Sequence, residues 1–194
     1  MNRCTRAILA VLLLPAVLHV TGCAVAAGAG IATGAVAITD RRTAGTFIDD
    51  QLIEVKVSDS LRTQEELWKQ SHVNATSFNN IVLLSGETPS EANKSRIGQI
   101  AANVQKVRQV HNELAIAAPS SLVARSSDTW VTGKVKTSLL GEMQLDATRV
   151  KVVTEQGVVY LMGLVTSAEA DLATELARRV GGVQRVVRLF EVTN

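Results

Sequence analysis

The side chains that most often carry catalysis or bind transition metals are scarce in this 194-residue chain. Its three histidines are His19, His72 and His111, and its two cysteines are Cys4 and Cys23. A nucleophilic site needs a base beside its nucleophile, and a zinc site needs several convergent ligands. His72 and His111 have no cysteine or second histidine near them in the sequence. The sequence therefore indicates a protein that is not an enzyme and has no metal site, no cofactor and no small-molecule substrate.

Two further patterns that could do chemistry have simpler explanations. Asp49 and Asp50 form a carboxylate pair, but Asp50 is expected to cap the helix that begins there. Gly28 and Gly30 lack the strand-to-helix context of a phosphate-binding loop. Neither pattern predicts a reaction.

Cys23 is the residue with the clearest predicted chemistry. Residues 1–6 carry two arginines, residues 7–20 are almost wholly apolar, and Val-Thr-Gly-Cys follows at 20–23. A basic segment, an apolar segment and small residues before a cut are typical of a secretory signal. The cysteine makes this end resemble the lipobox of bacterial lipoproteins, which implies cleavage after residue 22 and acylation of Cys23. A transmembrane anchor is the alternative, but the apolar run is shorter than the ~20 residues that span a bilayer.

The mature chain that this signal implies is neutral and has no disulfide. Removing residues 1–22 removes two of 20 basic residues and leaves 18 against 18 acidic ones. A neutral chain with 3% aromatic residues does not predict nucleic-acid binding. Cys4 leaves with the signal, so packing alone must hold the fold. Bacterial lipoproteins that stay in the inner membrane carry Asp directly after the acylated cysteine. This chain has Ala24 there, so its resemblance to lipoproteins implies release to the periplasmic face of the outer membrane.

Residues 23–47 are predicted to be a lipidated tether. The stretch 24–39 consists mostly of small and apolar residues, with several glycines. A membrane-embedded helix is the alternative, but 16 residues are too few to cross a bilayer comfortably. Small residues and glycines favour a loosely structured tether near the headgroups.

From residue 48 the sequence repeats itself. Three pairs of segments match: Asp50–Leu61 with Asp128–Leu139, Ile81–Gly86 with Val158–Gly163, and Val104–Val110 with Val180–Val186. Each copy is long enough to fold alone. The repeat predicts a first domain at 48–117, a linker at 118–124 and a second domain at 125–194.

Each copy shows the same order of periodicities. Apolar residues at i, i+4 and i+8 predict a helix that opens at Asp50 or Asp128. The strands are expected at 72–78, 81–86 and 110–116 in the first copy and at 149–154, 158–163 and 186–192 in the second. Second helices are expected at 90–104 and 167–180. Gly86 and Gly163 are expected to allow the turn into those helices. The fold class is therefore α+β, with two tandem α-β-β-α-β units, each a small sheet with two helices on one face.

Two such units, each with an apolar strand ending in glycine and a Val-x-x-Val-x-x-Val junction, resemble the BON domain. Paired behind a lipobox, they resemble the dual-BON outer-membrane lipoproteins. That resemblance implies phospholipid binding in the cell envelope and a role in keeping the outer membrane intact. Gly181-Gly182 fits the usual glycine of the junction, whereas Gln105-Lys106 does not.

The second copy is the predicted lipid-binding domain. Trp130 lies about 100° from Val131 and so falls outside the core stripe of its helix, with Lys134 and Thr137 on its flank. Trp favours the headgroup boundary, and Lys134 and Lys136 would attract an anionic phospholipid membrane. The alternative is that Trp130 packs against the other domain or the rim of the sheet.

A second function remains open on the sequence. The repeats could bind an envelope protein or each other, with lipid as an anchor only. The strand 186–192, near the C-terminus, could pair with such a partner as an exposed sheet edge. The first copy has Leu52 in place of Trp130 and an acidic helix, which favours a structural or protein-binding role for it.

Overall fold

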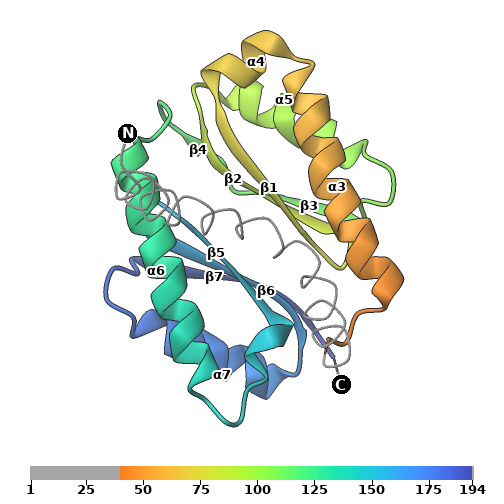
Figure 1. Cartoon of the computed structure of the whole chain (residues 1–194). Coiled ribbons are helices and arrows are strands. Elements are labelled where there is room, and N and C mark those ends of the chain that lie inside the picture. Colours follow the sequence, from red (N-terminus) through yellow and green to blue (C-terminus); the bar gives the residue numbers. More distant parts are fainter. Residues whose placement is uncertain (1–39, 194) are drawn as a thin grey trace, which may run out of the picture. The chain divides into compact units, whose positions relative to one another are not determined.

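The computed structural model describes residues 40–193, which belong to the compact unit Thr39–Asn194 (Figure 1). The predicted signal, Cys23 and residues 24–39 lie outside the described residues. The described chain consists of two copies of one α/β arrangement.

The first domain begins with helix α3 (Ala44–Arg62) and continues through strands, helices and a broken final strand. Its elements are α3, α4 (Glu65–Gln70), β1 (His72–Phe78), β2 (Ile81–Thr88), α5 (Glu91–Ala102), β3 (Gln109–Asn112) and β4 (Ala115–Ile116). Strands β1 and β2 are antiparallel, and β3 and β4 both run parallel to β2. The predicted strand 110–116 is interrupted because Leu114 turns into the buried core.

The second domain repeats this order without α4 and with an unbroken last strand. Its elements are α6 (Leu122–Leu140), a 3₁₀ turn (Ala147–Arg149), β5 (Val150–Glu155), β6 (Val158–Val165), α7 (Ser167–Arg178) and β7 (Arg185–Val192). The sheet order is β5-β6-β7, with β5 antiparallel and β7 parallel to β6. The predicted α+β class and the α-β-β-α-β order are confirmed.

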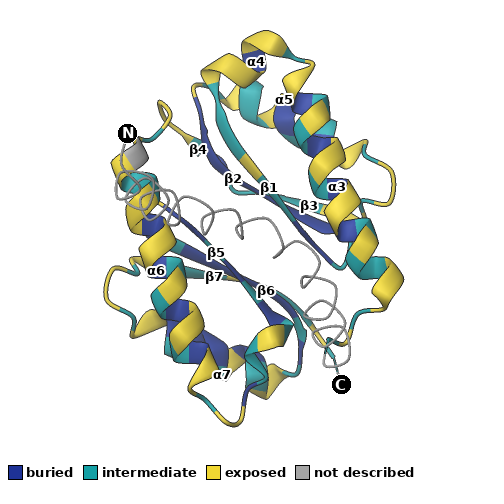
Figure 2. Ribbon diagram, viewed as in Figure 1, coloured by how far each residue is buried: buried dark blue, intermediate teal, exposed yellow. Residues whose placement is uncertain are grey.

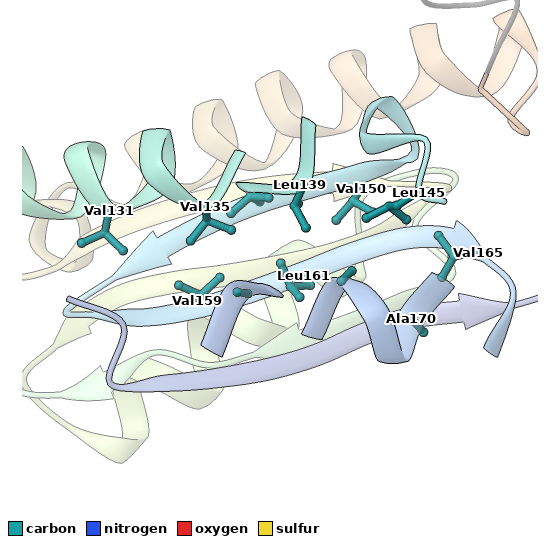
Figure 3. Packing of buried hydrophobic residues seen from close by; sticks show 12 residues of the cluster. Val131, Val135, Leu139, Leu145, Val150, Val159, Leu161, Val165 and Ala170 are labelled. Atoms are coloured by element: carbon teal, nitrogen blue, oxygen red, sulfur yellow. The ribbon is translucent and has the colours of Figure 1, made fainter. Parts of the chain in front are cut away.

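Each domain has its own apolar core between its helices and one face of its sheet (Figure 2). In the second domain, Val131, Val135 and Leu139 of α6 point toward Val159 and Leu161 of β6 (Figure 3). The predicted i, i+4, i+8 stripe is therefore the buried face of α6.

The two long helices begin earlier than the sequence suggested, and Asp50 and Asp128 are not their caps. The N-cap of α3 is Thr43, and that of α6 is Ser121, whose side chain accepts a hydrogen bond from Ala124 N. Asp50 and Asp128 lie inside the helices and are buried. Their carboxylates instead accept hydrogen bonds from the backbone amides of the hairpin turns.

Gly86 and Gly163 also differ from the expected role. Both lie inside strands, where β2 and β6 pass close to the start of the neighbouring strand. A Cβ on Gly86 would lie 2.0 Å from the carbonyl oxygen of His72, and one on Gly163 would lie 2.6 Å from that of Arg149. Close backbone approach therefore requires these glycines, since any side chain would collide with a carbonyl group.

The second faces of the two sheets meet in a third apolar cluster. It contains Phe78, Ile81 and Leu83 from the first domain and Tyr160 and Met162 from the second. Burial raises the pKa of Tyr160 to about 12, and the charge of Glu113 adds to the effect. Polar contacts surround the cluster, among them Lys151 Nζ to Glu54 Oε1 at 2.7 Å and Arg108 to Glu191 at 2.9 Å. The two domains are thus packed sheet to sheet.

Candidate functional site

Trp130 lies on the outer face of α6 and is 69% exposed. It follows Thr129 and precedes buried Val131, so it points away from the core as the helical wheel predicted. The sequence left open that Trp130 packs against the first domain. In the structure it does not, since most of its side chain is exposed. A large aromatic side chain on a domain surface marks an interaction site more often than an isolated aliphatic residue does.

The apolar surface around Trp130 continues along α6. Val123 lies two turns before it, Leu140 lies near the helix end and is 70% exposed, and Met143 in the following loop is fully exposed. We call these four exposed apolar residues the α6 stripe: Val123 and Trp130 lie on one side of the helix, Leu140 lies about 80° away from Trp130 around it, and Met143 follows its end. Helical periodicity alone places Val123 on the side of Trp130, whereas the exposure of Leu140 and Met143 follows from where α6 ends.

Two lysines flank the α6 stripe on opposite sides. Lys136 is exposed, whereas Lys134 is half-buried and its Nζ donates to the Gly181 carbonyl oxygen at the junction after α7. Thr137 is exposed between them, and its hydroxyl donates to the Gly133 carbonyl at 3.0 Å. The structure thus brings Trp130, Lys134, Lys136 and Thr137 together on the outside of one helix.

The α7–β7 junction is fitted closely against α6. Gly182 has φ +102°, and a Cβ there would lie 2.9 Å from Val131 Cγ2 and 3.5 Å from Lys134 Nζ. In the first domain, Lys106 has a positive φ of 74° at the corresponding junction. The second copy therefore has glycine where its junction packs against Val131 and Lys134 of α6.

The charges of the two long helices differ in sign. Helix α6 carries three basic residues and one acidic residue, a net charge of +2. Helix α3 carries four acidic and two basic residues, a net charge of −2. Anionic headgroups would attract α6 and repel α3. Each basic residue near the membrane surface contributes about 1 kcal/mol to binding.

Helix α3 nevertheless has an apolar stripe of its own. Ile48, Leu52 and Val55 are exposed at i, i+4 and i+7. The sequence analysis considered only Leu52 at this face. Asp59 continues the same side one turn later, so the stripe ends in a negative charge.

The chain enters the described unit at the end of the second domain that carries Met143. Arg41 bonds Glu169 at 2.7 Å, and Glu169 also bonds Arg149 at 3.1 Å. Arg149 in turn pairs with Asp146, at the end of the loop that contains Met143. These ion pairs place the point where the tether joins the fold beside the far end of the α6 stripe.

The pKa of two carboxyl groups at this entry is lowered. Burial opposes ionisation of Glu169, but its bonds to Arg41 and to Thr166 outweigh burial and lower its pKa to about 2. Burial likewise opposes ionisation of Asp40, but its hydrogen bonds to Arg42 keep the pKa below 3.8. Both groups are therefore held as charged anchors of the entry segment.

A separate polar cluster lies where the two domains meet. His72 and Glu87 belong to the first domain and Glu155 belongs to the second, and the three offer ligand atoms within 4.8 Å of one another. Burial acts to raise the pKa of Glu87, but hydrogen bonds from Ser120, Gln156 and His72 lower it. Burial, aided by the charge of Glu87, raises the pKa of Glu155. In the sequence His72 stands 15 and 83 residues from the two glutamates, so this cluster could not be predicted from spacing.

Within residues 40–193, no helix combines the length and the hydropathy needed to cross a bilayer. The family model of the BON domain matches residues 49–118 and 127–194. The chain therefore belongs to the BON domain family and has two BON domains.

Three similar proteins each match at least 73% of this chain. The chain is 36% identical over 180 residues to the outer membrane lipoprotein DolP of Haemophilus influenzae, and the match covers 93% of both chains. It is 35% identical to the 21 kDa hemolysin of Actinobacillus pleuropneumoniae, over 78% of each chain. It is 32% identical to osmotically-inducible protein Y of Escherichia coli, over 73% of this chain and 72% of that one. These matches make this a DolP-type protein.

Proposed function

We propose that this chain is a non-enzymatic, lipid-anchored periplasmic protein that binds anionic phospholipid through its second BON domain and supports outer-membrane integrity. The observation that carries the proposal is the exposure of Trp130 on a helix of net charge +2 that also carries Lys134 and Lys136. An exposed indole with lysines at its sides matches the apolar–polar boundary of a membrane surface.

The surface alone supports only weak binding. Burying most of the Trp130 side chain contributes about 2–3 kcal/mol, and each lysine near an anionic surface contributes about 1 kcal/mol. A total of this size is far from stable association. A second attachment is needed, as for other proteins that bind membranes through one small patch.

Acylated Cys23 would supply that second attachment. In this layout residues 1–22 are the removed signal, residues 23–47 hold the tether, and 118–124 link the two BON domains. Only 16 residues separate Cys23 from Asp40, which limits the reach to about 60 Å. The described entry beside Arg41 and Glu169 is on the Met143 end of the second domain. The tether therefore keeps the α6 stripe at high effective concentration near the membrane.

A lipid titration followed by NMR tests the proposal. The fragment 40–194 keeps all of α3 and its ion pairs to Arg42, and anionic or zwitterionic bicelles would be added to it. The expected result is that shifted amides cluster around Trp130, Lys134 and Leu140, with anionic bicelles only. No shift with anionic bicelles at low salt would contradict the proposal.

A second candidate function is protein binding through the first domain. The exposed stripe of Ile48, Leu52 and Val55 on an acidic helix favours a protein partner over an anionic membrane. Leu52→Glu would then remove a copurifying envelope protein that Trp130→Ala leaves bound. Loss of the partner with Trp130→Ala alone would place protein binding on the second domain instead.

A further inference from the structure

Three metal-ligand side chains converge at the junction of the two domains, away from the α6 stripe. His72 Nδ1 lies 3.1 Å from Glu87 Oε2 and 3.9 Å from Glu155 Oε1. We propose that His72, Glu87 and Glu155 bind one divalent transition-metal ion, and that Zn²⁺ is the ion their chemistry suits best. Neutral imidazole and carboxylate oxygens are common zinc ligands.

The spacing of the three groups fits such an ion. Zn²⁺ binds nitrogen and oxygen ligands at about 2.0–2.2 Å, so the ligand atoms of a tetrahedral site lie about 3.4 Å apart. The distance from His72 to Glu87 is slightly shorter and that from His72 to Glu155 is slightly longer. All three ligand atoms lie within 4.8 Å of one another, so a small inward movement of the side chains would bring them to the spacing of a bound ion.

Hydrogen bonds from neutral groups already orient both carboxylates. Gln156 Nε2 donates to Glu87 Oε1 at 2.6 Å, and the Ser120 amide donates to Glu87 Oε2 at 3.2 Å. Asn74 Nδ2 donates to Glu155 Oε2 at 3.0 Å, which leaves Oε1 on the side of His72. Outer groups that fix ligand carboxylates in this way are a regular part of protein metal sites.

The charge of the cluster also favours a cation. Glu87 is fully buried and Glu155 nearly so, and the donors that the structure gives them are His72 and the neutral groups named above. The charge of Asp128, which also acts on Glu155, is negative. Two buried carboxylates held by His72 and neutral donors favour a cation beside them, and a divalent ion would supply that charge.

Two features beside the ligands leave room for the rest of a coordination shell. Ser85 lies on the same face of β2 as Glu87 and opposite Asn74 on β1. Its hydroxyl is buried and has no hydrogen-bond partner among the described residues. A cleft of about 340 Å³, lined by His72, Asn74 and Glu155 among others, opens from the cluster. The cleft gives an ion a path in and gives it space for a water ligand.

An ion at this site would connect the two BON domains directly. Two ligands come from β1 and β2 of the first domain, and the third comes from the end of β5 in the second. Binding therefore adds to the sheet-to-sheet packing, and the ion stabilises the folded state by its affinity for it.

Calorimetric titration with ZnCl₂ tests the site. The full chain in neutral detergent, stripped with a chelator, is expected to bind one Zn²⁺ with micromolar or tighter affinity. His72→Gln and Glu155→Gln should each weaken binding by at least about 100-fold, and Asn74→Ala should weaken it about tenfold. His111→Gln is the matched control, since His111 lies outside the cluster. It should bind as the unchanged chain does.

The melting temperature supplies an independent readout. Zn²⁺ should raise the melting temperature of the unchanged chain and of His111→Gln but not that of Glu155→Gln. The Glu155→Gln variant keeps an oxygen that accepts from Asn74, so it remains a test of the site even if His72→Gln does not fold. Absence of Zn²⁺ binding by the unchanged chain would overturn the proposal. Equal binding by the folded Glu155→Gln variant would overturn it as well.

Discussion

Asp50 and Asp128 hold the same place in the two domains, and each binds the hairpin turn of its own sheet. Asp50 accepts hydrogen bonds from the amides of Asn79 and Asn80 at 2.9 and 2.8 Å. Asp128 accepts from those of Gln156 and Gly157 at 2.8 and 2.9 Å. All four turn residues have positive φ, as a two-residue hairpin turn requires. In each domain a carboxylate from the long helix therefore stabilises the turn of the sheet.

Removing these carboxylates is expected to destabilise the fold. Asp128→Ala should lower the free energy of unfolding by about 2–4 kcal/mol, because two hydrogen bonds to a charged acceptor are lost. Asp50→Ala should cost more, since Asp50 also binds Arg42 and Ser77. Urea denaturation measures both. Asp171→Ala, at an exposed aspartate of α7, is the control and should change stability by less than about 0.5 kcal/mol. Equal effects of all three variants would refute this role.

The sequence revealed the repeat and the turns but not this use of the aspartates. Asn-Asn and Gln-Gly predict tight turns because the tolerance of a residue for positive φ depends on its own side chain and not on distant contacts. The partner of each aspartate is almost 30 residues away, so an acidic residue near a helix start was taken for a cap. Helix α4 was missed for a related reason, since its six residues carry one buried side chain, Leu67. Trp130 could be placed because exposure on a single helix follows from its periodicity, whereas the His72 cluster depends on how two domains meet.

The two adjacent glycines of the α7–β7 junction should differ in tolerance. Gly182→Ala is expected to lower the free energy of unfolding by about 1–3 kcal/mol, because its φ is positive and Val131 is too close. Gly181→Ala meets no atom within 4 Å and should be neutral to within about 0.5 kcal/mol. Thermal melting of the Gly181→Ala and Gly182→Ala variants measures both changes in stability. A loss at Gly181 as large as that at Gly182 would count against the close fit of this junction.

Acid should weaken the contact between the entry segment and the second domain. The pKa of Glu169 is lowered from 4.5 to about 2, so its contribution to stability is present above pH 4.5 and is lost as the pH falls toward 2. Glu169→Gln should therefore melt at a lower temperature than the unchanged chain at pH 7. The difference should shrink between pH 4.5 and pH 2.5. A difference independent of pH would mean that the charge of Glu169 does not matter.

The flanking lysines should govern the salt dependence of membrane binding. Lys136→Gln is expected to weaken binding to anionic vesicles about fivefold at low salt, which corresponds to about 1 kcal/mol. Lys134→Gln should have a smaller effect, since Lys134 is half-buried against Gly181. Lys56→Gln on α3 is the matched control and should leave binding unchanged. Cosedimentation with vesicles at two salt concentrations measures all three.

The central claim is that the second BON domain, through Trp130, is the surface that meets the membrane. Titration of fragment 40–194 with anionic vesicles, followed by NMR because NMR detects weak binding, tests it most directly when Trp130→Glu is compared with Leu52→Glu. Both side chains are exposed on equivalent helices, so both variants are expected to fold, which circular dichroism would verify. The account predicts that Trp130→Glu abolishes vesicle binding and that Leu52→Glu leaves it nearly intact. Equal loss in both variants, or retained binding by Trp130→Glu, would contradict the account.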